Sequence, residues 1–261
     1  MKKCIVCFLV TTSLCANMAP EVLEPFRKNS FVEAETFDGQ GVRDGECPST
    51  LMVERRQNLD KHEKVFTEIY DKAIWGRNDQ GVGFSGEGSL LLNTREYISF
   101  LEKFIKEYGI TSVVDAGCGD WEFSRYVDWT GINYSGYDIV TQVIEKNKIL
   151  FSSPTINFAR ANITTVDFPK ADLLLCKEVL QHLPNEDILK FLQQIEKFKY
   201  CLITNEVDPK TLSSKNSDIL IGRVHRVDLS CPPFNIEGKK VLNYTIGRGV
   251  HQVFLIDNTI D

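Results

Sequence analysis

The run VVDAGCGDW at residues 113–121 is the feature that most limits what this chain can fold into. An apolar segment leads directly into a Gly-x-Gly turn. Gly117 and Gly119 permit backbone angles that other residues avoid, and they let the chain approach a ligand closely at the carboxyl edge of a sheet. A dinucleotide-binding fingerprint needs a third glycine, but bulky Trp121 follows the turn instead. The pattern therefore favours a site for a nucleoside without phosphates over a pyrophosphate cradle.

Short apolar runs alternate with helical stretches after this turn, as they do in an α/β fold. Runs bounded by turn residues predict strands at 112–116, 134–137, 156–159, 172–176 and 200–204. The helical pattern predicts helices at 122–127, 140–150 and 185–198. This β-α-β-α-β order indicates a parallel, doubly wound sheet. Two later strands, 240–246 and 251–256, are separated by Gly247-Arg248-Gly249 and predict a terminal hairpin.

Asp138 is the next residue with a clear chemical meaning. It follows Gly119 by about the 20 residues expected of a ribose-binding acid and ends the second predicted strand. A carboxylate there can accept both hydroxyl hydrogens of a ribose. Each feature alone has another explanation, because Gly-x-Gly is common and an Asp at a strand end often caps a helix. A nicotinamide-dependent dehydrogenase also fits the pair, but Trp121 and the terminal hairpin argue against it.

Several motifs resemble those of the class I S-adenosylmethionine-dependent methyltransferases. DAGCG at 115–119 is similar to their motif I, Asp138 to the acidic residue ending their second strand, and 172–182 to their fourth-strand motif. The chain also resembles a bacterial-type subgroup of these enzymes. The motifs that carry this resemblance are GEGS at 86–89, GCGDW at 117–121, VLQHLP at 179–184, DLS at 228–230 and PFN at 233–235. The resemblance covers about residues 75–257. It implies a Rossmann-like, doubly wound seven-stranded sheet, mostly parallel with a terminal antiparallel hairpin.

The resemblance also implies roles for residues on the cofactor side, with S-adenosyl-L-methionine as the cofactor. Gly117 and Gly119 would contact its methionine part through the backbone, and Asp138 would bind the ribose hydroxyls. Asp115 would orient the turn and reach the cofactor amine through water. Ile139 would flank the adenine ring.

The remaining predicted site residues follow the third and fourth strands. Asn162 and Ile163 stand where many family members have an acidic residue for the adenine amino group, and Asn162 can still accept through its carbonyl oxygen. Lys177 is assigned to the cofactor, while Glu178 and His182 are the catalytic candidates. His182 fits a general base, or else it packs against or caps the following helix. Methyl transfer needs little more, because the sulfonium is already activated.

The N-terminal part of the chain differs in composition from the rest. Residues 1–19 carry two lysines and a short apolar run, which predict a secretory signal and are too short for the roughly 20 residues of a membrane span. The alternative is a segment that is not a signal. Residues 20–58 predict a poorly ordered segment, and 59–261 the methyltransferase domain with an N-terminal helical cap. Localisation stays open, because a signal predicts export whereas the cofactor is made in the cytosol.

The sequence does not identify the methyl acceptor. The net charge of -6 gives no attraction to a nucleic-acid backbone, and neither the cysteines nor the histidines show metal-ligand spacing. CKEV at 176–179 replaces the Asn/Asp-Pro-Pro-aromatic tetrapeptide of enzymes that methylate adenine or glutamine amides. The predicted function is methyl transfer to a small molecule or protein, and the alternative is a cofactor-binding pseudoenzyme without turnover. The oligomeric state is not predicted.

Overall fold

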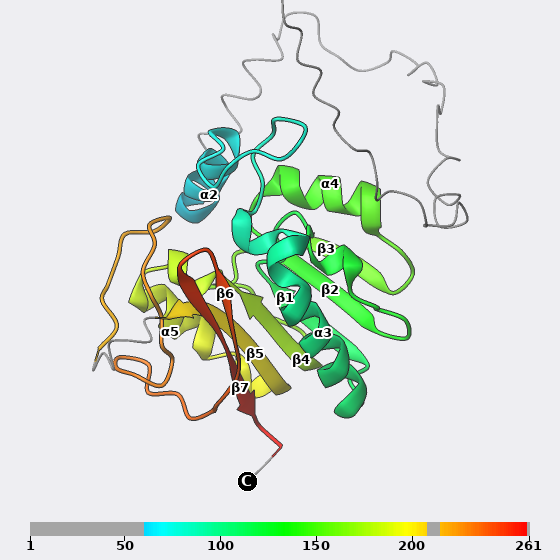
Figure 1. Ribbon diagram of the computed structural model, residues 1–261, viewed down its shortest axis with the longest axis vertical. Helices are drawn as coiled ribbons and strands as arrows, with labels where there is room; N and C mark the ends of the chain where they lie inside the picture. Colours follow the sequence, from blue (N-terminus) through cyan, green and yellow to red (C-terminus); the bar gives the residue numbers. More distant parts are fainter. Residues whose placement is uncertain (1–59, 208–214, 260–261) are drawn as a thin grey trace, which may run out of the picture. The chain divides into compact units, whose positions relative to one another are not determined.

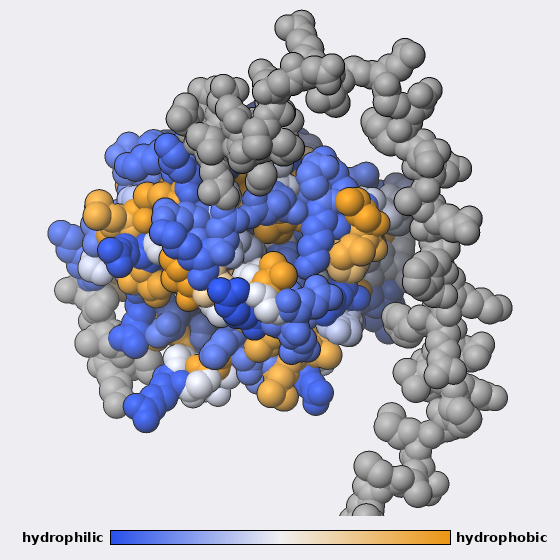
Figure 2. Space-filling view, turned by 90° about the horizontal axis from the view of Figure 1, so that it is seen from above, coloured by the Kyte–Doolittle hydropathy of each residue, from blue (hydrophilic) through white to orange (hydrophobic). Residues whose placement is uncertain are grey.

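The computed structural model describes residues 60–207 and 215–259, which form a seven-stranded sheet with helices on both faces (Figure 1). The predictions for residues 1–19 and 20–58 lie outside the described residues. None of the helices in the described ranges is long and apolar enough to cross a membrane. On the face seen in Figure 2, hydrophilic residues surround several separate hydrophobic patches.

The sheet has the strand order β3-β2-β1-β4-β5-β7-β6. Its strands are β1 (Ser112–Ala116), β2 (Asn133–Asp138), β3 (Ile156–Arg160), β4 (Ala171–Lys177), β5 (Phe198–Val207), β6 (Lys239–Ile246) and β7 (Gly249–Asp257). The first five pair in parallel, whereas β7 runs antiparallel to both of its neighbours. The predicted fold class, a mostly parallel doubly wound sheet with a terminal antiparallel hairpin, is confirmed.

Helices cover both faces of the sheet. Those in the described ranges are α2 (Lys61–Asp71), α3 (Leu91–Glu107), α4 (Thr141–Phe151) and α5 (Asn185–Leu192). One face packs against α3, which buries Tyr97 and Leu101 at helical spacing. The other face packs against α5 through Ile188. Adjacent strand residues therefore enter different cores: Leu173 lies in the core with α3, and Leu174 in the core with α5.

The helix predicted at 122–127 is wrong. Only a 3₁₀ turn, Ser124–Tyr126, follows the glycine turn. The reason lies in Trp121, which has a φ of 57° and buries its ring against Tyr134 and Phe158. This left-handed backbone interrupts the chain directly before the predicted helix.

The helix predicted at 185–198 is too long. It ends at Leu192, and a 3₁₀ turn at Ile195–Lys197 leads straight into β5 at Phe198. Ile195 is buried in the same core as the helix residues. The apolar spacing therefore continues past the real end of the helix, which is why it is a poor guide to that boundary.

The chain order reverses between β1 and β4, since β2 and β3 lie on one side of β1 while β4 and β5 lie on the other. Ligands of open α/β sheets bind in the crevice outside the carboxyl ends of the strands at such a point. Figure 1 shows α2 above this end of the sheet. The topology thus predicts where a ligand site should lie, without reference to any side chain.

Candidate functional site

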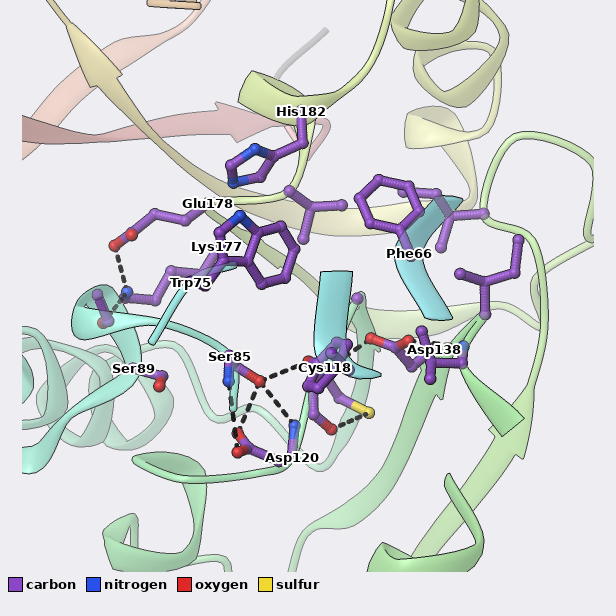
Figure 3. A pocket seen from close by; sticks show the side chains of 18 of the residues that line it. Phe66, Trp75, Ser85, Ser89, Cys118, Asp120, Asp138, Lys177, Glu178 and His182 are labelled. Atoms are coloured by element: carbon purple, nitrogen blue, oxygen red, sulfur yellow. Dashed lines mark hydrogen bonds and ion pairs between the residues drawn. The ribbon is translucent and has the colours of Figure 1, made fainter. Parts of the chain in front are cut away.

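A pocket opens at the carboxyl ends of β1, β2 and β4, and the segment 62–89 forms its opposite wall (Figure 3). It holds about 860 Å³ of empty space, including the part open to solvent. Nine of the ten predicted site residues line it: Gly117, Gly119, Asp138, Ile139, Asn162, Ile163, Lys177, Glu178 and His182. Asp115 is the exception.

The glycine turn after β1 is fitted closely between its neighbours. Gly117 has a φ of 85°, and a Cβ there would lie 2.3 Å from Val179 Cγ2. Gly119 has a φ of 53°, and a Cβ there would lie 2.4 Å from Ser85 Oγ. Both positions therefore need glycine for backbone conformation and for space. Any larger residue would push the turn away from the pocket wall.

Asp138, at the end of β2, fixes the same turn from the other side. Its Oδ2 accepts a hydrogen bond from Gly119 N at 3.1 Å, and its Oδ1 accepts one from Val140 N at 2.9 Å. Burial raises the pKa of Asp138 to about 6 against the opposing effect of these backbone N–H groups. At neutral pH the group is therefore mainly ionised. Each oxygen keeps a lone pair that can accept another hydrogen bond.

Asp115 does not line the pocket, and its role toward the cofactor stays a prediction. It is buried, and its Oδ2 accepts a hydrogen bond from the Tyr134 hydroxyl at 2.6 Å. Burial raises the pKa of Asp115 to about 7, although the Tyr134 hydroxyl opposes this. Its described partner belongs to β2 rather than to the pocket wall. The structure therefore gives Asp115 a supporting place next to the site.

Asn162 lines the pocket, but its carbonyl oxygen is already in use. Oδ1 accepts hydrogen bonds from Thr164 N at 3.0 Å and Thr164 Oγ1 at 2.8 Å, and Nδ2 donates to Asp60 Oδ2 at 3.3 Å. Asp60 is the N-cap of α2. Asn162 therefore connects the end of β3 to the start of α2. The expected adenine contact through Oδ1 has to compete with the two bonds from Thr164.

Ser85 ties the opposite wall of the pocket to the glycine turn. Its hydroxyl donates to Asp120 Oδ1 at 2.6 Å and accepts from Asp120 N at 2.9 Å. The Tyr70 hydroxyl lies 2.7 Å from the same oxygen. The single hydroxyl proton of Ser85 is donated to Asp120, so Tyr70 is the donor in the third bond. Burial raises the pKa of Tyr70, which keeps that proton in place.

The helix α2 is fixed to elements on both sides of the site. His62 Nε2 lies 2.8 Å from Asp187 Oδ2 on α5. Buried Glu63 pairs with Arg160 Nη1 at 2.7 Å at the end of β3, and it accepts a hydrogen bond from Thr141 Oγ1 of α4 at 2.6 Å. These contacts hold α2 across the carboxyl end of the sheet.

Lys177, the last residue of β4, is fully engaged by the protein. Its Nζ donates to Gly88 O at 2.8 Å and pairs with Glu178 Oε1 at 2.5 Å. Three aromatic rings surround the ammonium group, with centroid distances of 5.3 Å for Phe123, 5.6 Å for Tyr97 and 6.0 Å for Tyr244. The side chain is only 5% exposed. Lys177 therefore connects Glu178 to the GEGS turn at residues 86–89.

His182 lies above Trp75 at the same end of the pocket, with 4.8 Å between the ring centroids (Figure 3). Its Nδ1 lies 3.2 Å from Arg223 O. A carbonyl can only accept, so Nδ1 carries the proton and Nε2 keeps the lone pair. Burial lowers the pKa of His182, despite the Arg223 carbonyl, and favours this neutral form. No described residue forms a hydrogen bond with Nε2, which is therefore free to accept one.

Comparisons with known proteins match this architecture. A family model described as "Methyltransferase domain" matches residues 114–198, which span the glycine turn, Asp138 and the β4 motif. This segment is similar to the class I S-adenosylmethionine-dependent methyltransferases. No curated protein matches its sequence significantly.

Solved structures with the same methyltransferase fold are distant in sequence. Magnesium protoporphyrin IX methyltransferase from Synechocystis PCC 6803, with bound S-adenosylhomocysteine, is 13% identical, with a TM-score of 0.50 over 78% of this chain and 98% of that one. The N-terminal domain of EvdMO1, also with S-adenosylhomocysteine, is 12% identical, with a TM-score of 0.50 over 76% and 99%. At these identities the similarity establishes the fold alone.

Several side chains around the pocket were not predicted from the sequence. They are Tyr70, Ser85 and Asp120 in the network at the glycine turn, and Tyr244 and His251 near Glu178. One feature could have pointed to Tyr244 and His251: both are polar or titratable residues within the strands of the hairpin, and both are buried. Ser85 had none, since it sits in a short irregular segment between two helices.

Proposed function

We propose that this chain binds S-adenosyl-L-methionine in the pocket and transfers its methyl group to an acceptor. S-adenosyl-L-methionine is the cofactor of the superfamily. The observation that carries the proposal is the convergence of Gly117, Gly119 and Asp138 on one pocket at the switch point of a methyltransferase fold. In this arrangement α2 and residues 75–89 form the helical cap of the domain.

The residues at the nucleoside end fit the cofactor. Asp138 keeps two free lone pairs for the ribose hydroxyls, and Ile139 and Ile163 offer apolar contacts to a base. A pyrophosphate, by contrast, is usually bound at a helix N-terminus. Here the glycine turn leads into a 3₁₀ turn of three residues. This difference supports a nucleoside cofactor without phosphates and weighs against a dehydrogenase.

The chemical demands on the protein are modest. The sulfonium of the bound cofactor supplies an activated methyl group, so the protein has to align the acceptor and keep water away. Phe66, Tyr70 and Trp75 give the pocket wall an apolar surface that excludes water. His182 Nε2 is the atom positioned to take a proton from the acceptor as the new bond forms.

Calorimetric titration of the full chain with S-adenosylmethionine, S-adenosylhomocysteine and NAD tests the cofactor. The first two should bind and NAD should not. Asp138→Ala removes the ribose acceptor and Gly117→Arg fills the turn, so both variants should lose binding while remaining folded by circular dichroism. Wild-type affinity in both variants, or preferential binding of NAD, would contradict the proposal.

The proton-acceptor role of His182 needs a separate test. His182→Asn keeps a donor near the Nδ1 position, which retains the contact with Arg223 O but removes the free ring nitrogen. We expect a slower methyl transfer, by roughly 100-fold, with unchanged affinity for S-adenosylhomocysteine. An unchanged rate with an identified acceptor would show that His182 only packs against Trp75.

A further inference from the structure

Glu178 has an unusual backbone conformation at the edge of the pocket. Its φ is 58°, a left-handed value that residues other than Gly, Asn and Asp seldom adopt. Its N–H donates to Thr204 O on β5 at 2.8 Å. Strained residues of this kind persist where the surrounding structure holds them, and they concentrate at functional sites. The side chain of Glu178 is part of the pocket lining.

One carboxylate oxygen of Glu178 is held by residues from two parts of the fold. Oε1 pairs with Lys177 Nζ at 2.5 Å. The terminal hairpin supplies two further groups, His251 Nδ1 at 3.4 Å and the Tyr244 hydroxyl at 3.5 Å. Their rings stack with centroids 5.5 Å apart, which fixes one relative to the other. Burial keeps the Tyr244 pKa above its usual value, so its hydroxyl stays a donor.

The other oxygen, Oε2, is left without a hydrogen bond to any described residue. It lies against Gly88, where an added Cβ would be 1.8 Å away. Glycine at position 88 therefore leaves room for the carboxylate and lets the GEGS turn close over it. The side chain lines the pocket and is 15% exposed, and its Oε2 keeps free lone pairs to accept a hydrogen bond.

The charge of Glu178 defines what it can do. Burial alone would raise its pKa, but the Lys177 ammonium group and His251 outweigh burial and lower the pKa to about 2. Such a weak base does not take a proton at neutral pH. It is instead a fixed anionic hydrogen-bond acceptor, and such charge-assisted bonds are stronger than neutral ones.

We propose that Glu178 recognises the methyl acceptor through a hydrogen bond from a donor group of that molecule, and that Lys177, Tyr244 and His251 are positioning residues for its carboxylate. The inference rests on the proposed function and adds the chemical class of the acceptor. Glu178 Oε2 and His182 Nε2 are both hydrogen-bond acceptors, so the molecule that meets them presents O–H or N–H groups. A carboxylate nucleophile is disfavoured, because it would bring a second negative charge next to Glu178.

Three small aromatic probes separate these classes: phenol, benzylamine and benzoate, each incubated with the full chain and S-adenosylmethionine. S-adenosylhomocysteine formation gives kcat and KM for each probe. For the wild type we expect kcat/KM for phenol or benzylamine to exceed that for benzoate at least tenfold. Glu178→Gln should raise KM for the donor probes about tenfold and reduce their advantage over benzoate, while Glu178→Asp, which keeps the charge, should retain part of it.

Variants of the hairpin test the positioning role. Tyr244→Phe and His251→Leu should each raise KM for the donor probes several-fold, and His251→Asn, which keeps a donor near Nδ1, should restore it. Glu186→Gln is the matched control, because Glu186 lies on α5 with a side chain 80% exposed. It should behave as the wild type.

Calorimetry with S-adenosylhomocysteine on every protein separates this inference from the proposed function. Failure of the wild type to bind contradicts the proposed function itself. With binding intact, three results overturn the inference alone: preference for benzoate, no turnover of either donor probe, or a Glu178→Gln variant with the wild-type ranking of probes. A purely structural role would instead lower cofactor affinity and the rates for all three probes together.

Discussion

Asp138→Asn is the most informative single change in the cofactor half of the pocket. It removes the charge with almost no change in shape. Each ribose hydroxyl bond to a charged group contributes about 1.5–3 kcal/mol, and Asn can still accept at one of the two positions. We therefore expect a loss of about 2–4 kcal/mol in binding free energy, which is roughly a 30- to 1,000-fold weaker Kd for S-adenosylhomocysteine.

The folded state should tolerate this change. One of the two backbone donors, Gly119 N or Val140 N, would face the new amide NH₂ and lose its acceptor. The loss is opposed by removal of a buried carboxylate whose pKa is raised to about 6. The free energy of unfolding should therefore change by less than about 2 kcal/mol.

Calorimetry at pH 7.5 measures the affinity, and urea unfolding measures the stability of the same preparations. Asp79→Asn, at an exposed position in the loop after α2, is the control for loss of one negative charge. A Kd for Asp138→Asn within threefold of the wild type would refute the reasoning that this carboxylate binds the ribose.

Three further results are expected. The affinity of the wild type for S-adenosylhomocysteine should fall about tenfold between pH 8 and pH 5, because Asp138, with a pKa of about 6, is protonated in acid and can no longer accept both ribose hydroxyls. Calorimetry across this range should show no such fall for Asp138→Asn. A rise in the wild-type affinity toward pH 5 would contradict the assignment. Gly117→Ala should destabilise the protein by about 2–4 kcal/mol in urea unfolding, because the φ of 85° at this position is left-handed and the new Cβ would meet Val179. Wild-type stability of this variant would mean that the turn can move freely. Lys177→Met should destabilise by about 3–5 kcal/mol because it removes the lysine that pairs with the buried Glu178 carboxylate. The double variant with Glu178→Gln should recover most of that loss, and additive losses would argue against the ion pair.

The central strands and their arrangement follow from sequence patterns that are local. The strand predicted at 112–116 is β1 as observed, because its apolar run ends directly at the glycine turn. Asp138 and the glycine turn were expected to meet, since parallel strands end at one edge of the sheet. Asn162 could have been assigned better, because Asn-x-Thr at 162–164 is typical of a side-chain turn that uses the Asn oxygen.

Other parts of the site depend on contacts between distant segments, which a local pattern does not contain. Tyr244 reaches Glu178 across 66 residues of chain, and Ser85 reaches Asp120 across 35. The same is true of the backbone at Trp121 and Glu178. Both have positive φ values that their residue types do not suggest, because tertiary packing rather than local preference sets them.

The place of β7 in the sheet has a consequence for biosynthesis. β7 follows β6 in the chain but lies between β5 and β6. A ribosome-bound chain that has released everything up to β5 therefore carries an open sheet edge, which must wait for the hairpin to be made. The glycine turn and Asp138 are complete by then, whereas His251 is not. A nascent chain would therefore complete the residues proposed to bind the cofactor before it completes those proposed to position Glu178 for the acceptor.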